Sequence, residues 1–220
     1  MKSRRVWAWA IICFVLVLLL VGAFWLDPIV REWIIEHQNR AVHSLMEDVS
    51  RWGDWYEHVI VGFVLVGFAR WRRNKRWTRV FISMLAACAL AGATARVIKN
   101  TAGRARPSVK SELAWSGPSL SEKYHAFPSG HTASSTAFFA VLCLASWRIG
   151  VPLLLVPLLI AFSRMYVAAH YLSDVVFAAI LGIVCALIVA RLMKVRLTTT
   201  DLQMDDRTSN AEHRTPNGNE

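Results

Sequence analysis

The stretch VWAWAIICFVLVLLLVGAFWL, residues 6–26, decides the class of this protein. It contains no charged residue, and about 20 residues is the length that an α-helix needs to cross a bilayer. Lys2, Arg4 and Arg5 precede it, but the FWLDP sequence at its end, residues 24–28, lacks the small residues of a signal-peptide cleavage site. We therefore expect a retained transmembrane helix.

The whole chain has the composition of a membrane protein. Of its 220 residues, 55% are hydrophobic and only 18% are charged, and ten are Trp. The formal net charge is +10, but the Lys and Arg residues lie between apolar runs and show no nucleic-acid-binding pattern. We therefore expect anionic lipid, and no nucleic acid, as a partner. The four cysteines lie inside apolar runs without disulfide or metal-ligand spacing, which indicates core residues.

Six apolar runs predict an all-α integral membrane protein with six transmembrane helices. The runs are residues 6–26, 59–69, 80–95, 132–147, 149–162 and 171–190. The second run reaches a sufficient length only if its helix begins at Trp55, with the aromatic residues at the membrane interface. Residues 27–54 alternate apolar and charged positions at roughly helical steps, which predicts an interfacial amphipathic helix. We interpret this helix as an external connector that caps the bundle, in preference to a gate for lipid entry.

The basic residues predict the orientation, because short cytoplasmic loops carry an excess of Lys and Arg. The N-terminal cations, the cluster at residues 70–79, Arg148 and the cations at residues 191–196 all fall on one side of the six-helix plan. Both termini are then cytoplasmic. We expect a membrane domain over residues 1–197 and a disordered polar tail over residues 198–220.

One external segment breaks this charge rule. The predicted external loop, residues 96–131, carries six cations and only two acidic residues, Glu112 and Glu122; the cations are Arg96, Lys99, Arg104, Arg106, Lys110 and Lys123. Positive charge kept on the external side needs a reason, and binding of an anionic group is the simplest one.

The residues that can carry chemistry fall on the same external side. Lys99 and Arg106 follow the third helix, His131 begins the fourth, Arg164 lies near the end of the fifth, and His170 and Asp174 open the sixth. His170 and Asp174 are four residues apart, so on a helix the carboxylate can accept a hydrogen bond from one ring nitrogen and leave the other free. The alternative is a helix-capping histidine with a surface carboxylate.

A second motif, FPSGHTASS at residues 127–135, marks a helix start. Ser129 is a possible N-cap, and the backbone N–H groups at Gly130 and His131 favour an anion. Taken alone, this is an ordinary helix start. Arg164 lies in an apolar run, where a charge usually faces a cavity or a partner, with snorkelling to the headgroups as the alternative.

These motifs together resemble the three-part signature of the type 2 phosphatidic acid phosphatases. The parts are Lys99, separated by six residues from Arg106-Pro107; then Pro128-Ser129-Gly130-His131; then Ser163-Arg164, separated by five residues from His170, with three more residues before Asp174. The family includes bacterial lipid-phosphate and undecaprenyl-diphosphate phosphatases, glucose-6-phosphatase and, as soluble relatives, the vanadium haloperoxidases. The resemblance implies a PAP2/haloperoxidase-like helical core and a membrane lipid phosphatase.

The resemblance also implies a role for each matched residue. His170 would attack phosphorus to form a phosphohistidine, and Asp174 would orient it. His131 would protonate the leaving oxygen and then activate water. No metal or cofactor is implied. The residues implied to hold the phosphate oxygens are Lys99, Arg106, Arg164, Ser129 and Gly130.

Three alternatives stay open. A metal site could use His125, His131, His170 and Asp174, although the neighbouring cations oppose it. A vanadate-dependent oxidase and a catalytically inactive relative are the other two.

The sequence does not single out one lipid substrate. Undecaprenyl diphosphate, phosphatidylglycerophosphate, phosphatidic acid and lipid A all carry a suitable phosphate. The small size favours a bacterial cytoplasmic (inner) membrane enzyme with an external, periplasmic site, and hence the polyprenyl diphosphate.

Overall fold

The computed structural model describes residues 2–195, with side chains from residue 6 onward. The described chain is helical apart from its connecting loops and one isolated bridge between Arg104 and Trp115. The helices are α1 (Lys2–Glu36), α2 (Arg40–Trp52), α3 (Trp55–Trp71), α4 (Lys75–Ala102), the 3₁₀ turn η1 (Glu122–Tyr124), α5 (Gly130–Ala145), α6 (Trp147–Leu153), α7 (Leu155–Tyr166) and α8 (Leu172–Leu192). The predicted tail, residues 198–220, lies outside the described residues.

Four helical segments are long and apolar enough to cross a membrane. They are Val6–Glu36, Lys75–Ala102, Trp147–Tyr166 and Leu172–Leu192. The other two predicted spans correspond to α3 and α5, which have 17 and 16 residues and are shorter than a typical span. The all-α, membrane-type architecture is therefore confirmed, with four spans defined by length and composition.

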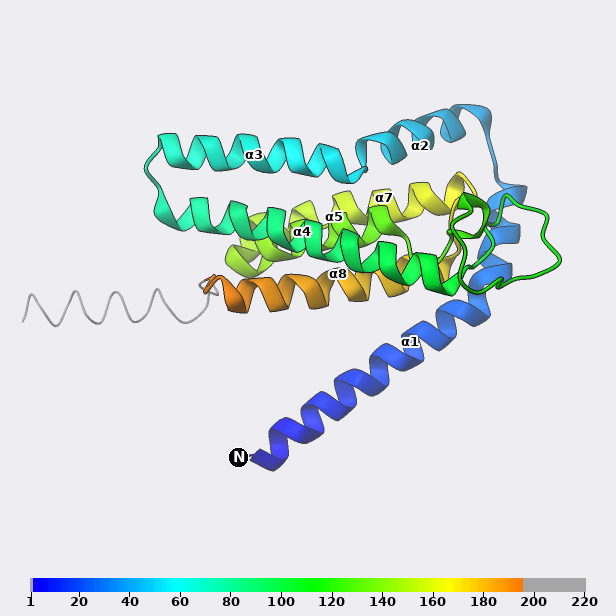
Figure 1. The fold of residues 1–220 in the computed structure, drawn as a ribbon, viewed down its shortest axis with the longest axis horizontal. Coiled ribbons are helices and arrows are strands. Elements are labelled where there is room, and N and C mark those ends of the chain that lie inside the picture. Colours follow the sequence, from blue (N-terminus) through cyan, green and yellow to red (C-terminus); the bar gives the residue numbers. More distant parts are fainter. Residues whose placement is uncertain (1, 196–220) are drawn as a thin grey trace, which may run out of the picture.

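Helix α5 lies at the centre of the bundle, because it packs against α4 and α8 and also contacts α3, α6 and α7. Figure 1 shows it alongside α4. Its inward residues are mostly small, among them Ala133, Ser134 and Ala137, and all three are buried. Small residues let helix backbones approach closely in a membrane. Gly182 on α8 shows how close this approach is, because a Cβ there would lie 2.7 Å from the Ala133 carbonyl oxygen. The start of α5 is therefore held rigidly at one end of the bundle.

Helix α1 has two parts with different surroundings. Its first part leaves the bundle, as Figure 1 shows, and nearly all of its apolar side chains are exposed. Its second part, residues 27–36, contains Pro28, a residue that commonly kinks a helix. Figure 1 shows that α1 changes direction before its C-terminal end and then runs along the end of the bundle that carries the long loop. There Ile34 packs against Met46 of α2 and Tyr166 of α7.

This second part of α1 corrects the prediction for residues 27–54. Residues 27–36 continue α1, and only residues 40–52 form the separate helix α2. Contacts with distant segments explain the continuation, since Arg31 donates a hydrogen bond of 2.6 Å to the Pro107 carbonyl in addition to the packing of Ile34. The sequence pattern of residues 27–54 could not reveal those contacts.

The end of α4 also differs from the prediction. The helix continues to Ala102, so Lys99 lies in its last turn and does not follow it. Gly103 ends the helix with a φ of 63°, a left-handed conformation that a glycine adopts without steric penalty. The chain then enters the loop that carries Arg104 and Arg106.

Candidate active site

His170 lies in the short loop between α7 and α8 and is 3% exposed. Its backbone N–H and that of Ala169 both donate to the Arg164 carbonyl, at 3.2 and 3.1 Å, so the loop is tied to the last turn of α7. The Nδ1 atom lies 2.5 Å from the Ala126 carbonyl oxygen. Because a carbonyl only accepts, Nδ1 carries the hydrogen and Nε2 keeps its lone pair.

The prediction that His170 donates a hydrogen bond to Asp174 is wrong. The Nδ1 atom lies 3.7 Å from Asp174 Oδ2, which is too long for a hydrogen bond. The carboxylate instead accepts from the Tyr171 N–H at 2.7 Å and from Arg104 Nη1 at 2.5 Å. The prediction placed both residues on α8, but this helix begins at Leu172, so His170 precedes it and Asp174 caps it.

His170 is uncharged near neutral pH. Burial lowers its pKa well below the usual 6.5, and the positive charges of Lys99 and Arg164 lower it further, with Arg106 adding to the same effect. The hydrogen bond to the Ala126 carbonyl opposes this shift but does not reverse it. The ring therefore presents a neutral Nε2 to three cations.

This lowered pKa predicts a pH-dependent stability. The unfolded chain protonates His170 below about pH 6.5, whereas the folded chain does not, so this residue contributes stability that is lost as the pH falls below 6.5. We expect the unfolding temperature of the wild type to fall more between about pH 7.5 and about pH 5.0 than that of His170→Gln. Thermal unfolding in detergent measures the unfolding temperature of both proteins at each pH. An equal decrease in the two would contradict a lowered pKa at His170.

His131 lies at the start of α5, as predicted. The helix begins at Gly130, and the Ser129 hydroxyl oxygen accepts from the Thr132 N–H at 3.5 Å and from its hydroxyl at 3.0 Å. Ser129 is completely buried, so its side chain caps the helix from within. The His131 Nε2 atom lies 3.7 Å from an oxygen of Asp54, the N-cap residue of α3.

The three predicted cations come from three different elements. Lys99 is on α4, Arg106 is on the loop that follows, and Arg164 is on α7. The Lys99 Nζ atom lies beside Gly130, 4.0 Å from the position that a Cβ would take there. The charges of all three act on His170. We call these three side chains, together with His131 and His170, the cationic site.

Two donors of the cationic site have no acceptor. The Nε atoms of Arg106 and Arg164 are buried without a hydrogen-bond partner among the described residues, although Arg164 also donates through Nη1 to the Ser50 hydroxyl. Buried donors are normally paired, because leaving one unpaired costs roughly 1–3 kcal/mol. An anion with several acceptor oxygens is the kind of ligand that these donors fit.

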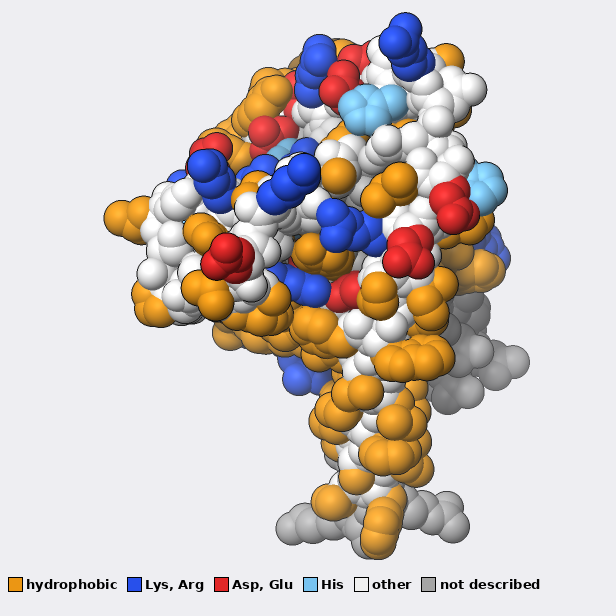
Figure 2. All heavy atoms as spheres, turned by 90° about the vertical axis from the view of Figure 1, so that its right-hand side faces the viewer, with side chains coloured by type: hydrophobic (Ala, Val, Ile, Leu, Met, Phe, Trp, Pro, Cys, Tyr) orange, Lys and Arg blue, Asp and Glu red, His pale blue; other side chains and the backbone are white. Residues whose placement is uncertain are grey.

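The surroundings of the cationic site include both polar and apolar surfaces. Figure 2 looks onto the loop-bearing end of the molecule, where Lys and Arg side chains gather around a hollow and hydrophobic side chains cover α1. A cavity of about 70 Å³ reaches His170. Its walls come largely from the second part of α1, with Val30 and Ile34 supplying apolar surface.

Metal ligands are not grouped at this site. Within residues 2–195, no three His, Cys, Asp or Glu side chains lie close enough together to hold a metal ion. Of the histidines considered as ligands, His125 lies 2.9 Å from the Ser119 carbonyl oxygen through Nε2, and His170 uses Nδ1 on Ala126. The charged side chains that act most strongly on His170 are therefore cations, Lys99 and Arg164.

Sequence reasoning missed several residues that complete the site. Arg104 was counted only as one more cation of the loop, but its guanidinium binds Asp174. Asp27 was taken as the end of the first span, and it is 5% exposed and bonded to Arg104. Asp54 faces His131. A charge next to Pro28 in an apolar helix was the available signal for Asp27, and the loop position of Arg104 carried none.

The fold and the site define a class, an α-helical multi-pass membrane protein with a cationic site between its helix ends. The model of the PAP2 superfamily matches residues 80–197, more than half of the chain, so this chain belongs to the PAP2 superfamily. Every residue of the predicted signature, from Lys99 to Asp174, lies within the match.

Individual relatives agree with this family. The chain is 34% identical over 110 residues to a lipid A 1-phosphatase of Rhizobium johnstonii, covering 46% of this chain and 44% of that protein. It is 26% identical over 151 residues to the undecaprenyl-diphosphatase BcrC of Bacillus subtilis, covering 68% and 74%. The chain spans about half the length of two of the curated relatives that it matches.

A solved structure supports the fold. The crystal structure of a transmembrane PAP2-type phosphatidylglycerolphosphate phosphatase from Bacillus subtilis aligns with a TM-score of 0.63 at 16% identity, covering 84% of this chain and 98% of that chain. At this identity the likeness concerns the fold alone.

Proposed function

We propose that this protein is a membrane-embedded lipid phosphatase that works through a phosphohistidine intermediate and needs no metal or cofactor. One observation carries the proposal: two buried guanidinium Nε donors, which have no hydrogen-bond partner within residues 2–195, lie in a site whose histidine holds its hydrogen on Nδ1. A phosphoryl group in transfer spreads negative charge over three oxygens and is stabilised by fixed cations. Membership in the PAP2 superfamily supports the same reaction class.

The first half of the reaction would use both histidines. The lone pair of His170 Nε2 forms a bond to phosphorus while the bond from phosphorus to the leaving oxygen breaks. His131 donates a proton to that oxygen. Lys99, Arg106 and Arg164 hold the phosphate oxygens, and the N-terminus of α5 at Ser129 and Gly130 adds backbone donors.

The second half would release phosphate. His131, now neutral, takes a proton from water as the water oxygen attacks phosphorus, and the bond between phosphorus and nitrogen breaks. His170 regains its lone pair, and inorganic phosphate leaves. Asp174 acts in both halves as a buried negative charge 3.7 Å from Nδ1, which stabilises the positive charge on the phosphorylated ring.

The proposed topology keeps six crossings. In this arrangement α3 and α5 are the shorter spans, the interfacial helix is α2, and residues 1–197 form one membrane domain with cytoplasmic termini. The cationic site then opens to the periplasmic side of a bacterial inner membrane, at the level of the lipid headgroups. The residues from 96 to 131 supply part of that site.

A lipid panel tests the substrate class. We propose a lipid diphosphate of the undecaprenyl type, because BcrC, an undecaprenyl-diphosphatase, matches this chain over 74% of its own length. Phosphate release by purified protein in detergent is measured with undecaprenyl diphosphate, phosphatidylglycerophosphate, phosphatidic acid and a lipid A phosphate. Higher turnover with one of the other three would reassign the substrate.

Metal independence gives a separate prediction. We expect phosphate release to continue undiminished in excess EDTA and to be inhibited by vanadate, a phosphate analogue that the three cations can bind. Malachite-green detection of phosphate measures both effects on one preparation. Loss of activity in EDTA with recovery on adding a divalent metal would contradict the anion site.

A further inference from the structure

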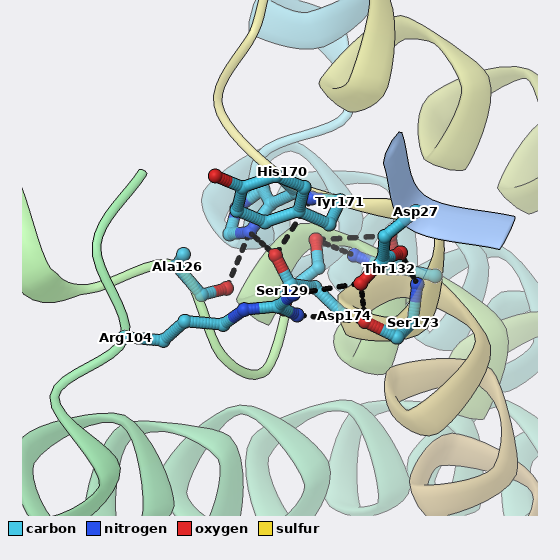
Figure 3. Close-up of polar contacts among 9 residues, drawn as sticks. All are labelled: Asp27, Arg104, Ala126, Ser129, Thr132, His170, Tyr171, Ser173 and Asp174. Carbon is cyan, nitrogen blue, oxygen red and sulfur yellow. Dashed lines mark hydrogen bonds and ion pairs between the residues drawn. The ribbon is translucent and has the colours of Figure 1, made fainter. Parts of the chain in front are cut away.

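One buried arginine joins two carboxylates from opposite ends of the chain. Arg104 is 8% exposed, and its Nη2 atom donates to Asp27 Oδ2 at 2.7 Å. Its Nη1 atom donates to Asp174 Oδ1 at 2.5 Å and to the Ser173 hydroxyl oxygen at 2.7 Å. Figure 3 shows the guanidinium pointing at these groups, with Asp27 reaching in from α1.

Asp27 also binds the start of α8 directly. Its Oδ1 atom accepts from the Ser173 N–H at 2.8 Å, and its Oδ2 atom accepts from the Ser173 hydroxyl at 2.6 Å. Asp27 is 5% exposed, while Ser173 and Asp174 are completely buried. A carboxylate on α1 is thus tied to the backbone and the side chain of Ser173, the residue before Asp174, and to the arginine that neutralises Asp174.

Arg104 is also linked to His170 through the backbone of Ala126. Its carbonyl oxygen accepts from the Ala126 N–H at 3.0 Å, and the Ala126 carbonyl holds His170 Nδ1. Three rings surround the guanidinium, those of Phe24, Trp115 and Tyr171, with centroids 5.2, 5.1 and 4.2 Å from Cζ. This enclosure limits water, so the ionic contacts act at a low local dielectric constant.

From these contacts we infer that Asp27 and Arg104 are positioning residues of the catalytic site, and that α1 thereby forms part of the catalytic apparatus. The inference rests on the proposed function. Arg104 places and neutralises Asp174, and Asp27 holds Arg104 and the first turn of α8 in register. Without Arg104, two buried carboxylates would lack their shared counter-ion, which is strongly unfavourable. Asp27 lies outside residues 80–197, the segment that the family model matches.

A double-mutant cycle tests this inference with Asp27→Asn, Arg104→Lys and the double variant. Asn keeps the shape of Asp27 without its charge. Lys keeps the charge of Arg104 but lacks the two guanidinium nitrogens that bind Asp27 and Asp174 at the same time. We expect kcat to fall about tenfold in Asp27→Asn and about a hundredfold in Arg104→Lys, with KM within about twofold of the wild type. The double variant should match Arg104→Lys alone, because both residues act through Asp174.

The control pair is Asp48 and Arg51, which form an exposed ion pair at 3.7 Å on α2. Asp48→Asn and Arg51→Lys should keep the wild-type kcat. A folded Asp27→Asn protein with the wild-type kcat would overturn the inference, as would multiplicative losses in the double variant or losses confined to KM. If Asp27→Asn does not fold, Ser173→Ala replaces it, since it removes only the shared hydroxyl; a wild-type kcat there has the same meaning.

Vanadate affinity separates this inference from the proposed function. Binding of orthovanadate to wild type and variants needs no turnover, and we expect it to weaken about tenfold in Asp27→Asn. If the wild type releases phosphate from no lipid, the proposed function fails, and vanadate affinity alone decides the role of the pair. Equal affinity in wild type and Asp27→Asn would then refute positioning.

Discussion

Replacing His170 by alanine should abolish phosphate release. The substitution removes the nitrogen proposed to bond phosphorus, and loss of an enzyme nucleophile lowers kcat by at least about a thousandfold. The cations and the N-terminus of α5 stay in place, so binding of the substrate should change little. Phosphate release by purified protein at saturating lipid measures the loss, and vanadate affinity should fall with it because the ring nitrogen is gone.

The chain offers a matched control for this variant. His43 and Glu47 are also a histidine and a carboxylate four residues apart, with 3.6 Å between their nearest atoms, but they lie on the exposed face of α2. We expect His43→Ala to keep the wild-type kcat. Turnover of His170→Ala within about tenfold of the wild type would reject His170 as the nucleophile.

Replacing His131 by alanine should slow the reaction by an amount that depends on the leaving group. General acid catalysis contributes roughly a hundredfold to ten-thousandfold when the leaving oxygen is a poor one, such as the alkoxide oxygen of phosphatidic acid. With p-nitrophenyl phosphate the leaving oxygen departs without protonation, so the loss should be much smaller. The ratio of the two losses, measured on the same preparation, reports the proton transfer.

The two histidines should therefore respond differently to the same pair of substrates. His170→Ala should lose activity equally on both, since attack on phosphorus is needed whatever the leaving group. Equal losses in His131→Ala would instead argue that His131 does not protonate the leaving oxygen. The position of His131 at the start of α5, with Asp54 at 3.7 Å, is compatible with a proton donor at the mouth of the site.

Local sequence determined the elements and most of the site. Long apolar runs require membrane helices because backbone polar groups must be satisfied inside hydrocarbon, and the described helices follow these runs. Ser129 and Gly130 start α5 because a hydroxyl and a flexible residue suit a helix N-terminus. The fixed spacings of the signature were enough to predict that Lys99, Arg106, Arg164, His131 and His170 share one site.

Only the tertiary structure decided how α1 and the loop after α4 are connected at the site. Asp27 and Arg104 are 77 residues apart, and neither belongs to a local pattern that predicts pairing. Their bond exists because the second part of α1 packs across the start of α8, and burial makes the pairing of each charge obligatory. The partner of His170 Nδ1 was likewise decided by packing, which brings the Ala126 carbonyl closer than the Asp174 carboxylate.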